Sequence, residues 1–370
     1  MTSRGARLSD AQRLDWLRLI RTEQVGPRTF RALINQFGTA AAALEALPGL
    51  ARKGGRSSVP QSPSRAQMEA EMAALARMGG RLAVSGDADY PPALRMLDDA
   101  PPVLAVRGSA ALLAAPKVAI VGARNASAAG RTMAARLARD IADAGYVIVS
   151  GLARGIDTAA HGAALDLGTI GVFAGGLARP YPPENIPLME KMAVQGALVS
   201  EMPLEWEPRA RDFPRRNRLV SGMSLGVVVV EAALRSGSLI TARLAADQGR
   251  EVFAVPGSPL DPRAGGTNSL LKSGATFVTE AADVLDALAP LLLHAPSTDM
   301  EAPEAPAPRP EPSDGDRARI IELLGPVPTY PDEIVRLSGA HASEVQIVLL
   351  ELDLAGRLER HAGGAVSLVG

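Results

Sequence analysis

The sequence predicts an α/β protein whose central domain is a doubly wound, mostly parallel β-sheet. Short runs of β-branched, apolar residues recur along the middle of the chain, and helical runs separate them. The strand runs are apolar on both faces, as expected for strands that helices cover on two sides. Alternation of strand and helix at this spacing is typical of doubly wound parallel sheets. Regions of different composition flank this alternation, and they predict further domains.

The elements expected in the central domain follow in a regular order. The six expected strands are 117–121, 146–150, 169–173, 197–200, 225–230 and 251–255. The helical runs between them include 129–144, 158–167 and 239–248. Apolar pieces within 80–107 are expected to add strands at an edge of the sheet.

The N-terminal region predicts a small helical domain. Apolar residues around Leu17, and again from Phe30 to Phe37, repeat at helical spacing, and Gly26-Pro27 breaks the chain between them. Two short helices around such a turn resemble helix-hairpin-helix or SAM-like modules. A plain helical bundle fits the pattern equally well. A stretch rich in Gly, Ser and Pro at 53–65 marks a boundary.

The C-terminal region predicts a linker followed by a winged helix-turn-helix. Residues 295–314 contain six prolines, which favours an extended linker. Residues 315–370 follow the order helix, helix, helix, hairpin, which is that of a winged helix. The expected domains are therefore 1–65, 66–294 and 315–370. The last has a net charge of −3, which favours protein contact over DNA reading because phosphates require positive neighbours.

Composition excludes several classes of protein. The 370 residues contain no cysteine, which excludes disulfide frameworks, thiolate zinc sites and cysteine nucleophiles. We expect a cytoplasmic protein without a signal peptide or membrane span, because no segment is apolar enough for either. No P-loop motif occurs, and G-x-G-x-x-G is absent from the first strand-to-helix turn. We expect no catalytic residue, metal or cofactor.

The placement of arginine is more informative than the net charge of −1. The chain has 35 Arg and 4 Lys, an excess that genomic base composition explains most simply. The region 101–294 nevertheless has a net charge of +2, and residues 209–218 hold five Arg against one Asp. Arginine can bind a phosphate through two parallel N–H donors.

Glycine combined with Arg or a hydroxyl recurs after four or five of the predicted strands. Ligands bind at this end of open α/β sheets, and helix N-termini attract anions. One mononucleotide needs one such loop, so the repetition points to several phosphates of a nucleic-acid strand. The candidate nucleic-acid-binding residues are Gly122, Arg124, Ser127, Gly151, Arg154, Gly176, Phe213, Arg215, Arg216, Asn217, Arg218, Ser236, Gly237, Ser238 and Thr241.

The expected mode of binding is recognition of the backbone with weak sequence preference. Only 3% of the residues are aromatic, which limits base stacking. Gripping four or five phosphates of a single strand predicts a slope of log affinity against log salt of roughly −3 to −3.5. The pattern leaves open which of Arg215, Arg216 and Arg218 faces the groove. Asp157 is expected to cap a helix, and His161 to be a structural helix residue that could pair with it.

Six ordered motifs across about 80–290 resemble the DprA/Smf family of DNA-processing proteins. They are VAIVGARNASAAG, VSGLARGIDTAAHGAAL, FAGGLARPYPPEN, VSEMPLEWEPRARDFPRRNRLVSGMS, VVVVEAALRSGSLITARLA and VFAVPGSPLDPRAGGTNSLLKSGA. The resemblance implies an extended Rossmann-like domain that binds single-stranded DNA, between a SAM-like and a winged-helix domain. It also implies a homodimer formed through about 268–278, and loading of a RecA-type recombinase during natural transformation.

The resemblance carries binding roles onto three matched motifs. The GSR-type turn corresponds to Gly122, Arg124 and Ser127, with Ala123 where the family commonly has Ser or Thr. The FPxRN segment corresponds to Phe213, Arg215, Arg216 and Asn217. The SGS-x-x-T turn corresponds to Ser236, Gly237, Ser238 and Thr241.

Two other functions remain open. A nucleotide phosphoribohydrolase of the lysine-decarboxylase-like class shares this kind of sheet, but its P-G-G-x-G-T-x-x-E motif is replaced here by a turn at 235–241 that no catalytic Glu follows. A transcription regulator would use the winged helix to bind a specific duplex, and this binding would survive deletion of 81–294.

Overall fold

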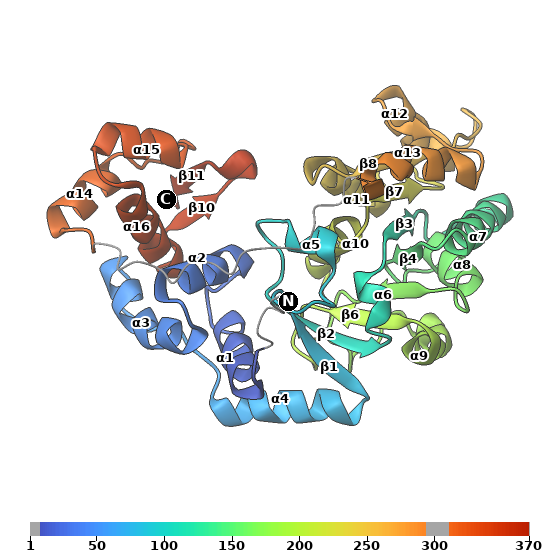
Figure 1. Ribbon diagram of the computed structural model, residues 1–370. Coiled ribbons are helices and arrows are strands. Elements are labelled where there is room, and N and C mark those ends of the chain that lie inside the picture. Colours follow the sequence, from blue (N-terminus) through green and yellow to red (C-terminus); the bar gives the residue numbers. More distant parts are fainter. Residues whose placement is uncertain (1–7, 294–310, 370) are drawn as a thin grey trace. The chain divides into compact units, whose positions relative to one another are not determined.

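The computed structural model describes residues 8–293 and 311–369, which form two compact units (Figure 1). The sheet unit consists of residues 71–299, and the helical unit combines residues 1–70 with 300–370. Most of the predicted linker, 295–310, lies outside the described residues.

The sheet unit contains one nine-stranded sheet in the order β1-β2-β6-β5-β4-β3-β7-β8-β9. β1 pairs antiparallel with β2, and β2 antiparallel with β6, whereas all other neighbours are parallel. The bounds are β1 Gly80–Val84, β2 Val103–Gly108, β3 Lys117–Val121, β4 Val147–Ser150, β5 Thr169–Val172, β6 Ala197–Ser200, β7 Gly226–Val229, β8 Glu251–Ala254 and β9 Thr276–Phe277. This confirms the predicted doubly wound sheet.

Helices cover both faces of the sheet, as the two-sided apolar strands require. The first layer contains α5 Pro92–Arg95, α6 Ala111–Ala114, α10 Asp212–Gly222 and α11 Gly237–Asp247. The opposite layer contains α7 Ala128–Asp143, α8 Ile156–Ala163 and α13 Ala281–Leu293. The unit also holds α9 Ile186–Gln195, α12 Gly265–Lys272 and the 3-10 turns Pro183–Asn185 and Pro262–Ala264.

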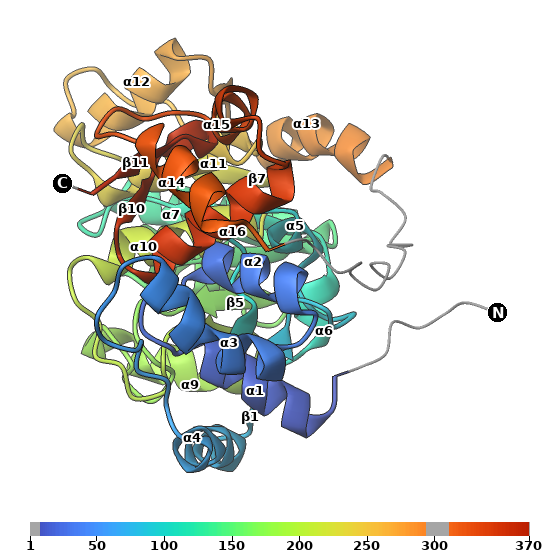
Figure 2. The same cartoon turned by 90° about the vertical axis from the view of Figure 1, so that its left-hand side faces the viewer.

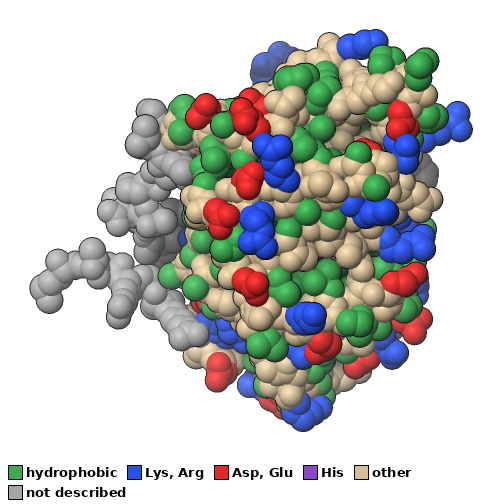
Figure 3. All heavy atoms as spheres, turned by 90° about the vertical axis from the view of Figure 1, so that its right-hand side faces the viewer, with side chains coloured by type: hydrophobic (Ala, Val, Ile, Leu, Met, Phe, Trp, Pro, Cys, Tyr) green, Lys and Arg blue, Asp and Glu red, His purple; other side chains and the backbone are tan. Residues whose placement is uncertain are grey.

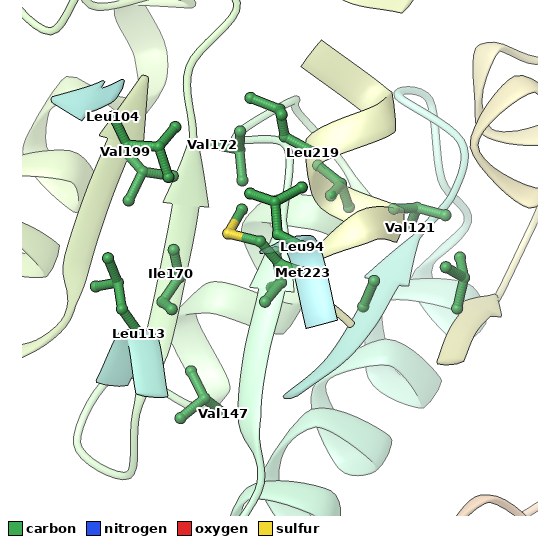
Figure 4. Packing of buried hydrophobic residues seen from close by; sticks show 14 of the residues in the cluster. Leu94, Leu104, Leu113, Val121, Val147, Ile170, Val172, Val199, Leu219 and Met223 are labelled. Atoms are coloured by element: carbon green, nitrogen blue, oxygen red, sulfur yellow. The ribbon is translucent and has the colours of Figure 1, made fainter. Parts of the chain in front are cut away.

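The core of the sheet unit follows from strand alternation. On β3, Val118 and Ile120 pack against the α7 layer, whereas Ala119 and Val121 pack against the α10 layer. Figure 4 shows the layer that contains α10, where side chains from α5, α6 and α10 meet those of the strands. Burial of this kind stabilises a fold by about 25 cal/mol for each Å² of apolar surface removed from water.

The sheet changes winding direction between β3 and β7. From β3 the chain adds β4, β5 and β6 on one side, and then returns through α10 to place β7 on the other side. The loops after β3 and β7 therefore leave the sheet side by side and diverge toward opposite layers. Such a switch point is the usual ligand site of open α/β sheets.

The helical unit contains both ends of the chain. Its elements are α1 Asp10–Ile20, α2 Pro27–Phe37, α3 Ala40–Lys53, α14 Asp314–Glu322, α15 Pro331–Ser338, α16 Ala342–Leu354, β10 Leu358–Arg360, the 3-10 turn Ala362–Gly364 and β11 Val366–Leu368. α4, Arg65–Arg77, crosses the boundary between the two units. The three helices and hairpin after residue 311 confirm the predicted winged helix.

On the face drawn in Figure 3, Lys and Arg side chains are interspersed with Asp and Glu, and they form no single large charged patch. Within residues 8–293 and 311–369, no helix is both long and apolar enough to cross a membrane.

Candidate nucleic-acid interface

A cleft of about 570 Å³ opens at the switch point of the sheet, and we call it the switch-point cleft. Its walls come from the loops after β3, β4 and β7 and from the first turns of α10 and α11. Of the predicted site residues, the lining includes Gly122, Arg124, Gly151, Phe213, Arg216, Asn217, Ser236, Gly237, Ser238 and Thr241. The structure thus brings together ten of the fifteen predicted site residues, although they are distant in sequence.

Phe213 lies at the centre of a small group of cations. The guanidinium carbon of Arg124 is 5.5 Å from the centre of the Phe213 ring, and that of Arg216 is 5.9 Å from it. Arg124 is exposed, and no salt bridge to it occurs among the described residues. An exposed guanidinium on an aromatic face is held in place while its N–H donors stay available to an anion.

Arg216 is buried beneath this group. Its Nη1 donates to the carbonyl oxygens of Gly151 and Val172, and its Nε donates to Asn217 Oδ1 at 3.1 Å. Burial lowers the pKa of Arg216 to about 10, so the side chain remains charged at neutral pH. Gly151 makes room for it, since a Cβ there would lie 2.6 Å from the guanidinium carbon. Arg216 therefore supplies positive charge to the floor of the cleft.

Asp157 is the internal counter-charge of Arg216, and the predicted helix cap at this position is wrong. α8 begins at Ile156, two residues before the predicted start at 158, and Gly155 is its N-cap. The Asp157 carboxylate instead accepts from the N–H groups of Gly151 and Ala153, both at 3.1 Å. Burial raises the pKa of Asp157, and Arg216 partly offsets this rise. The carboxylate shapes the loop after β4.

His161 does not pair with Asp157, a contact that the sequence left open. Its Nδ1 lies 2.7 Å from Thr169 Oγ1, which in turn donates to the carbonyl oxygen of Ile148. Burial lowers the pKa of His161 to about 3, so the ring is neutral. It is a structural residue of the core, as the sequence suggested. Within residues 8–293 and 311–369, no cluster of three His, Asp or Glu side chains could hold a metal ion.

Ser127 lies apart from the cleft. Its hydroxyl caps α7 by accepting from Gly130 N at 2.8 Å, and its N–H donates to Glu231 Oε2 at 2.9 Å. Its hydroxyl also contacts the other Glu231 oxygen. The protein's own carboxylate therefore occupies the anion-binding N-terminus of α7. Ser127 and Glu231 line a separate hollow of about 240 Å³.

Arg215 of the FPxRN segment and Arg218, directly after it, both pair with Glu201. Arg215, which is half exposed, pairs with Glu201 at 2.9 Å. Arg218 is buried, contacts the other Glu201 oxygen and donates to the carbonyl oxygen of Asp99 at 2.8 Å. Of these three arginines, only Arg216 lines the switch-point cleft.

The start of α11 forms the opposite wall. The Ser236 side chain caps the helix by accepting from Ser238 N at 3.3 Å, and the two hydroxyl oxygens lie 2.7 Å apart. Gly237 is exposed, and a Cβ at this position would meet open space. The free N–H groups of a helix start carry partial positive charge, so an anion fits here.

A second hollow of about 190 Å³ adjoins the cleft across Phe213. Arg154 lines it and lies 3.6 Å from Glu184, with both side chains exposed. Tyr181 is half exposed and meets the Phe213 ring edge-on, with the ring centres 5.9 Å apart. Gly176 lies elsewhere, buried against the loop at 203–204, where a Cβ would lie 2.0 Å from the Leu204 oxygen.

The set of predicted site residues omitted three exposed polar residues that line the cleft. Asn125 and Arg235 are exposed, and Arg263 forms an exposed pair with Asp261 at 2.8 Å. Arg235 stands in the same turn as Ser236, so its position after β7 was a usable signal. Arg263 comes from the segment after β8, and no local pattern indicated that this segment reaches the cleft.

Comparison with known proteins decides the family. The family model of DNA recombination-mediator protein A matches residues 81–289. The chain belongs to this family. Models of a DprA-like N-terminal HHH domain and a DprA winged helix domain match residues 10–74 and 303–364. The helix-hairpin-helix prediction for the N-terminal part is thereby supported over a plain bundle.

Curated relatives and solved structures agree with this assignment. The chain is 40% identical to protein Smf of Escherichia coli over 75% of each chain, and 44% identical to DNA processing protein DprA of Bacillus subtilis over 54% of this chain and 68% of that protein. DNA processing protein A of Streptococcus pneumoniae is 31% identical with a TM-score of 0.63, covering 76% of this chain and 98% of that structure. A Helicobacter pylori relative, described by its single-stranded DNA binding mode, is 34% identical with a TM-score of 0.51, covering 54% and 93%.

Proposed function

We propose that the switch-point cleft binds single-stranded DNA by its phosphates and that this binding is non-catalytic. The observation that carries the proposal is the charge of the cleft lining. Four arginines line it, namely Arg124, Arg216, Arg235 and Arg263, against one carboxylate, Asp157. Asp157 is buried and accepts two backbone N–H groups, so the exposed charges of the lining are those of Arg124, Arg235 and Arg263.

Single strands fit this arrangement better than duplexes. Phe213 lines both the switch-point cleft and the adjoining hollow, and the half-exposed Tyr181 lines that hollow. Unstacked bases could contact either aromatic ring there. Stacking of this kind contributes about 1–3 kcal/mol per base and tolerates any sequence. Family membership and the Helicobacter pylori relative support the same ligand.

A homodimer that loads a RecA-type recombinase onto the bound strand completes the proposed activity. β9 is the edge strand of the sheet, and Phe277 on it is half exposed. An exposed apolar residue on an unpaired edge favours contact with a second chain. Two subunits would hold two stretches of one strand, which raises apparent affinity without new contacts.

A binding titration tests the proposed ligand. Fluorescence anisotropy would follow a labelled thymidine oligonucleotide and a duplex of equal length as protein is added. We expect the single strand to bind at least tenfold more tightly. Equal affinity for both, or tighter binding to the duplex, would contradict the proposal.

The alternative function, a nucleotide phosphoribohydrolase, is tested by an assay for release of free base. Its catalytic Glu has no counterpart in the turn at 235–241, and the cleft's one carboxylate is buried. Chromatography of nucleoside monophosphates incubated with the protein should show no free base. Release of base that Asp157→Asn abolishes would support the enzyme and exclude the non-catalytic assignment.

Recombinase loading is tested by filament assembly on strands coated with a single-strand-binding protein. The chain should accelerate assembly, and Arg124→Ala should weaken this acceleration in proportion to its loss of DNA affinity. If assembly is equally fast with and without the chain, the mediator role is wrong even where DNA binding holds.

A further inference from the structure

α16 occupies the position that reads DNA in helix-turn-helix modules. It follows α15 across a short turn, and in that motif the second helix lies in the major groove. A reading helix needs polar and basic side chains on its outer face. α16 carries Glu344, Glu351 and Asp353 and no Lys or Arg. Its charge therefore opposes approach to phosphates.

The face of α16 that points away from the winged-helix core, which we call its outer face, is apolar and buried. Eight residues of this helix are buried, namely Val345, Ile347, Val348, Leu349, Leu350, Glu351, Leu352 and Leu354. A helix that is apolar on all sides is an interior helix. One side of α16 packs in the winged-helix core, through Val345, Val348, Leu349 and Leu352.

The other side of α16 packs against the first helices of the chain. Leu350 and Leu354 belong to the same buried cluster as Phe30, Leu33 and Leu47, which come from α2 and α3. Figures 1 and 2 both show α16 beside α2 and α3. About 300 residues of sequence separate the two partners, so neither module alone could cover these leucines.

Polar contacts fix the register of this packing. Thr29 Oγ1 donates to Asp353 Oδ2 at 2.9 Å, and Arg357 Nη1 donates to the carbonyl oxygen of Gly54 at 3.1 Å. Gly54 is required for the close approach, because a Cβ there would lie 2.0 Å from the backbone oxygen of Glu351.

We propose that the outer face of α16 is a docking surface for the chain's own N-terminal helices. The two ends of the chain thereby close into one domain, and the sheet unit is an insertion within it. The winged helix acts as a clamp in this arrangement. It does not read duplex DNA, because the face that would enter the groove is already covered by α2 and α3.

Cutting the linker tests the clamp in the full chain. A site for a specific protease inserted within 295–310 allows cleavage of the folded protein, followed by size-exclusion chromatography. We expect the C-terminal fragment to co-elute with the remainder after cleavage. Separation of the two pieces at micromolar concentration would overturn the proposal.

Two glycine variants in the same cut protein locate the contact. Gly54→Val introduces a side chain against the Glu351 backbone and should release the fragment, which circular dichroism should show to be folded. Gly49→Val is the matched control, because a Cβ at Gly49 meets nothing within 4 Å, and it should keep the fragment bound. Retention of the fragment by Gly54→Val would contradict the assigned surface.

The absence of native cysteine allows a test of whether the partners belong to one chain. Thr29→Cys and Asp353→Cys, joined by a short bismaleimide, should give a product that migrates as a monomer on a denaturing gel. A product of doubled mass would mean exchange between copies and would overturn the intrachain clamp. The released fragment, although uncovered, should also fail to bind duplex DNA, because α16 carries acidic side chains and no Lys or Arg. Tight duplex binding would overturn the assigned role of α16.

Discussion

At the scale of single residues, burial distinguishes side chains that look equivalent in sequence. Arg215, Arg216 and Arg218 lie within four positions, yet two of them pair with Glu201 and one forms the floor of the cleft. The sequence could predict that this segment is basic and anchored. It could not predict which guanidinium faces the ligand, because Glu201 comes from the loop after another strand.

Replacement of the exposed Arg124 tests the phosphate contacts directly. Arg124→Ala should weaken single-strand binding at least tenfold, because a hydrogen bond to a charged group contributes about 1.5–3 kcal/mol. The loss should be similar for all base sequences, since phosphates carry no sequence information. Anisotropy with several oligonucleotides measures both effects.

Arg243 provides the matched control for Arg124. It is 83% exposed on α11 and does not line the cleft. Arg243→Ala should leave affinity within about twofold of the parent. An equal loss in the two variants would indicate a general effect of charge and would contradict the specific placement of Arg124.

Gly151 tests the buried position of Arg216. Gly151→Ala should displace the guanidinium from its carbonyl partners, costing about 1–3 kcal/mol of unfolding free energy and weakening DNA binding. Urea denaturation measures the first effect. Gly162→Ala in α8 is the control, because its Cβ meets nothing within 4 Å and Ala favours a helix. Equal stability of the two variants would count against the tight packing at Gly151.

Lys117 makes stability depend on pH. Burial lowers its pKa to about 7, whereas an unfolded lysine titrates near its ordinary value of 10.5. Between these values the folded chain binds fewer protons than the unfolded chain, so stability rises with pH. From pH 7 to 9 this contribution amounts to about 2 kcal/mol. Urea denaturation at both pH values should show this gain in the parent and lose it in Lys117→Met; identical gains in the two proteins would exclude Lys117 as the source.

At the scale of elements, strands were more predictable than the loops that follow them. The six predicted strands lie within one residue of the observed ends, because burial on both faces leaves an unmistakable apolar run. The loops hold the site, and their side chains point where tertiary contacts direct them. Ser127 illustrates this, since Glu231 from the loop after β7 binds it and no local pattern indicates that contact.

The cap at the N-terminus of α11 should matter for both stability and DNA binding. Ser236→Ala removes the cap and should cost about 1 kcal/mol of unfolding free energy. It should also weaken DNA binding, because the first N–H groups of α11 lose their fixed orientation. Ser236→Thr retains a capping oxygen and should preserve both properties. Parallel losses in the Thr variant would show that the hydroxyl is not the important group.

At the scale of the whole molecule, a net charge of −1 conceals an uneven distribution. The acidic excess belongs to residues 295–370, and the arginines of the cleft belong to the sheet unit. The sequence predicted this division by regional counts. It did not predict that the two ends of the chain form one unit, although the apolar outer face of α16 was visible in the letters IVLLELDL.

Salt dependence of single-strand binding tests the central claim most directly. Anisotropy titrations of a thymidine oligonucleotide between about 50 and 300 mM salt give the slope of log affinity against log salt. Four to five gripped phosphates predict a slope of roughly −3, reduced in magnitude by about 0.7 in Arg124→Ala. A slope near zero, unchanged in that variant, would contradict binding through backbone phosphates in the switch-point cleft.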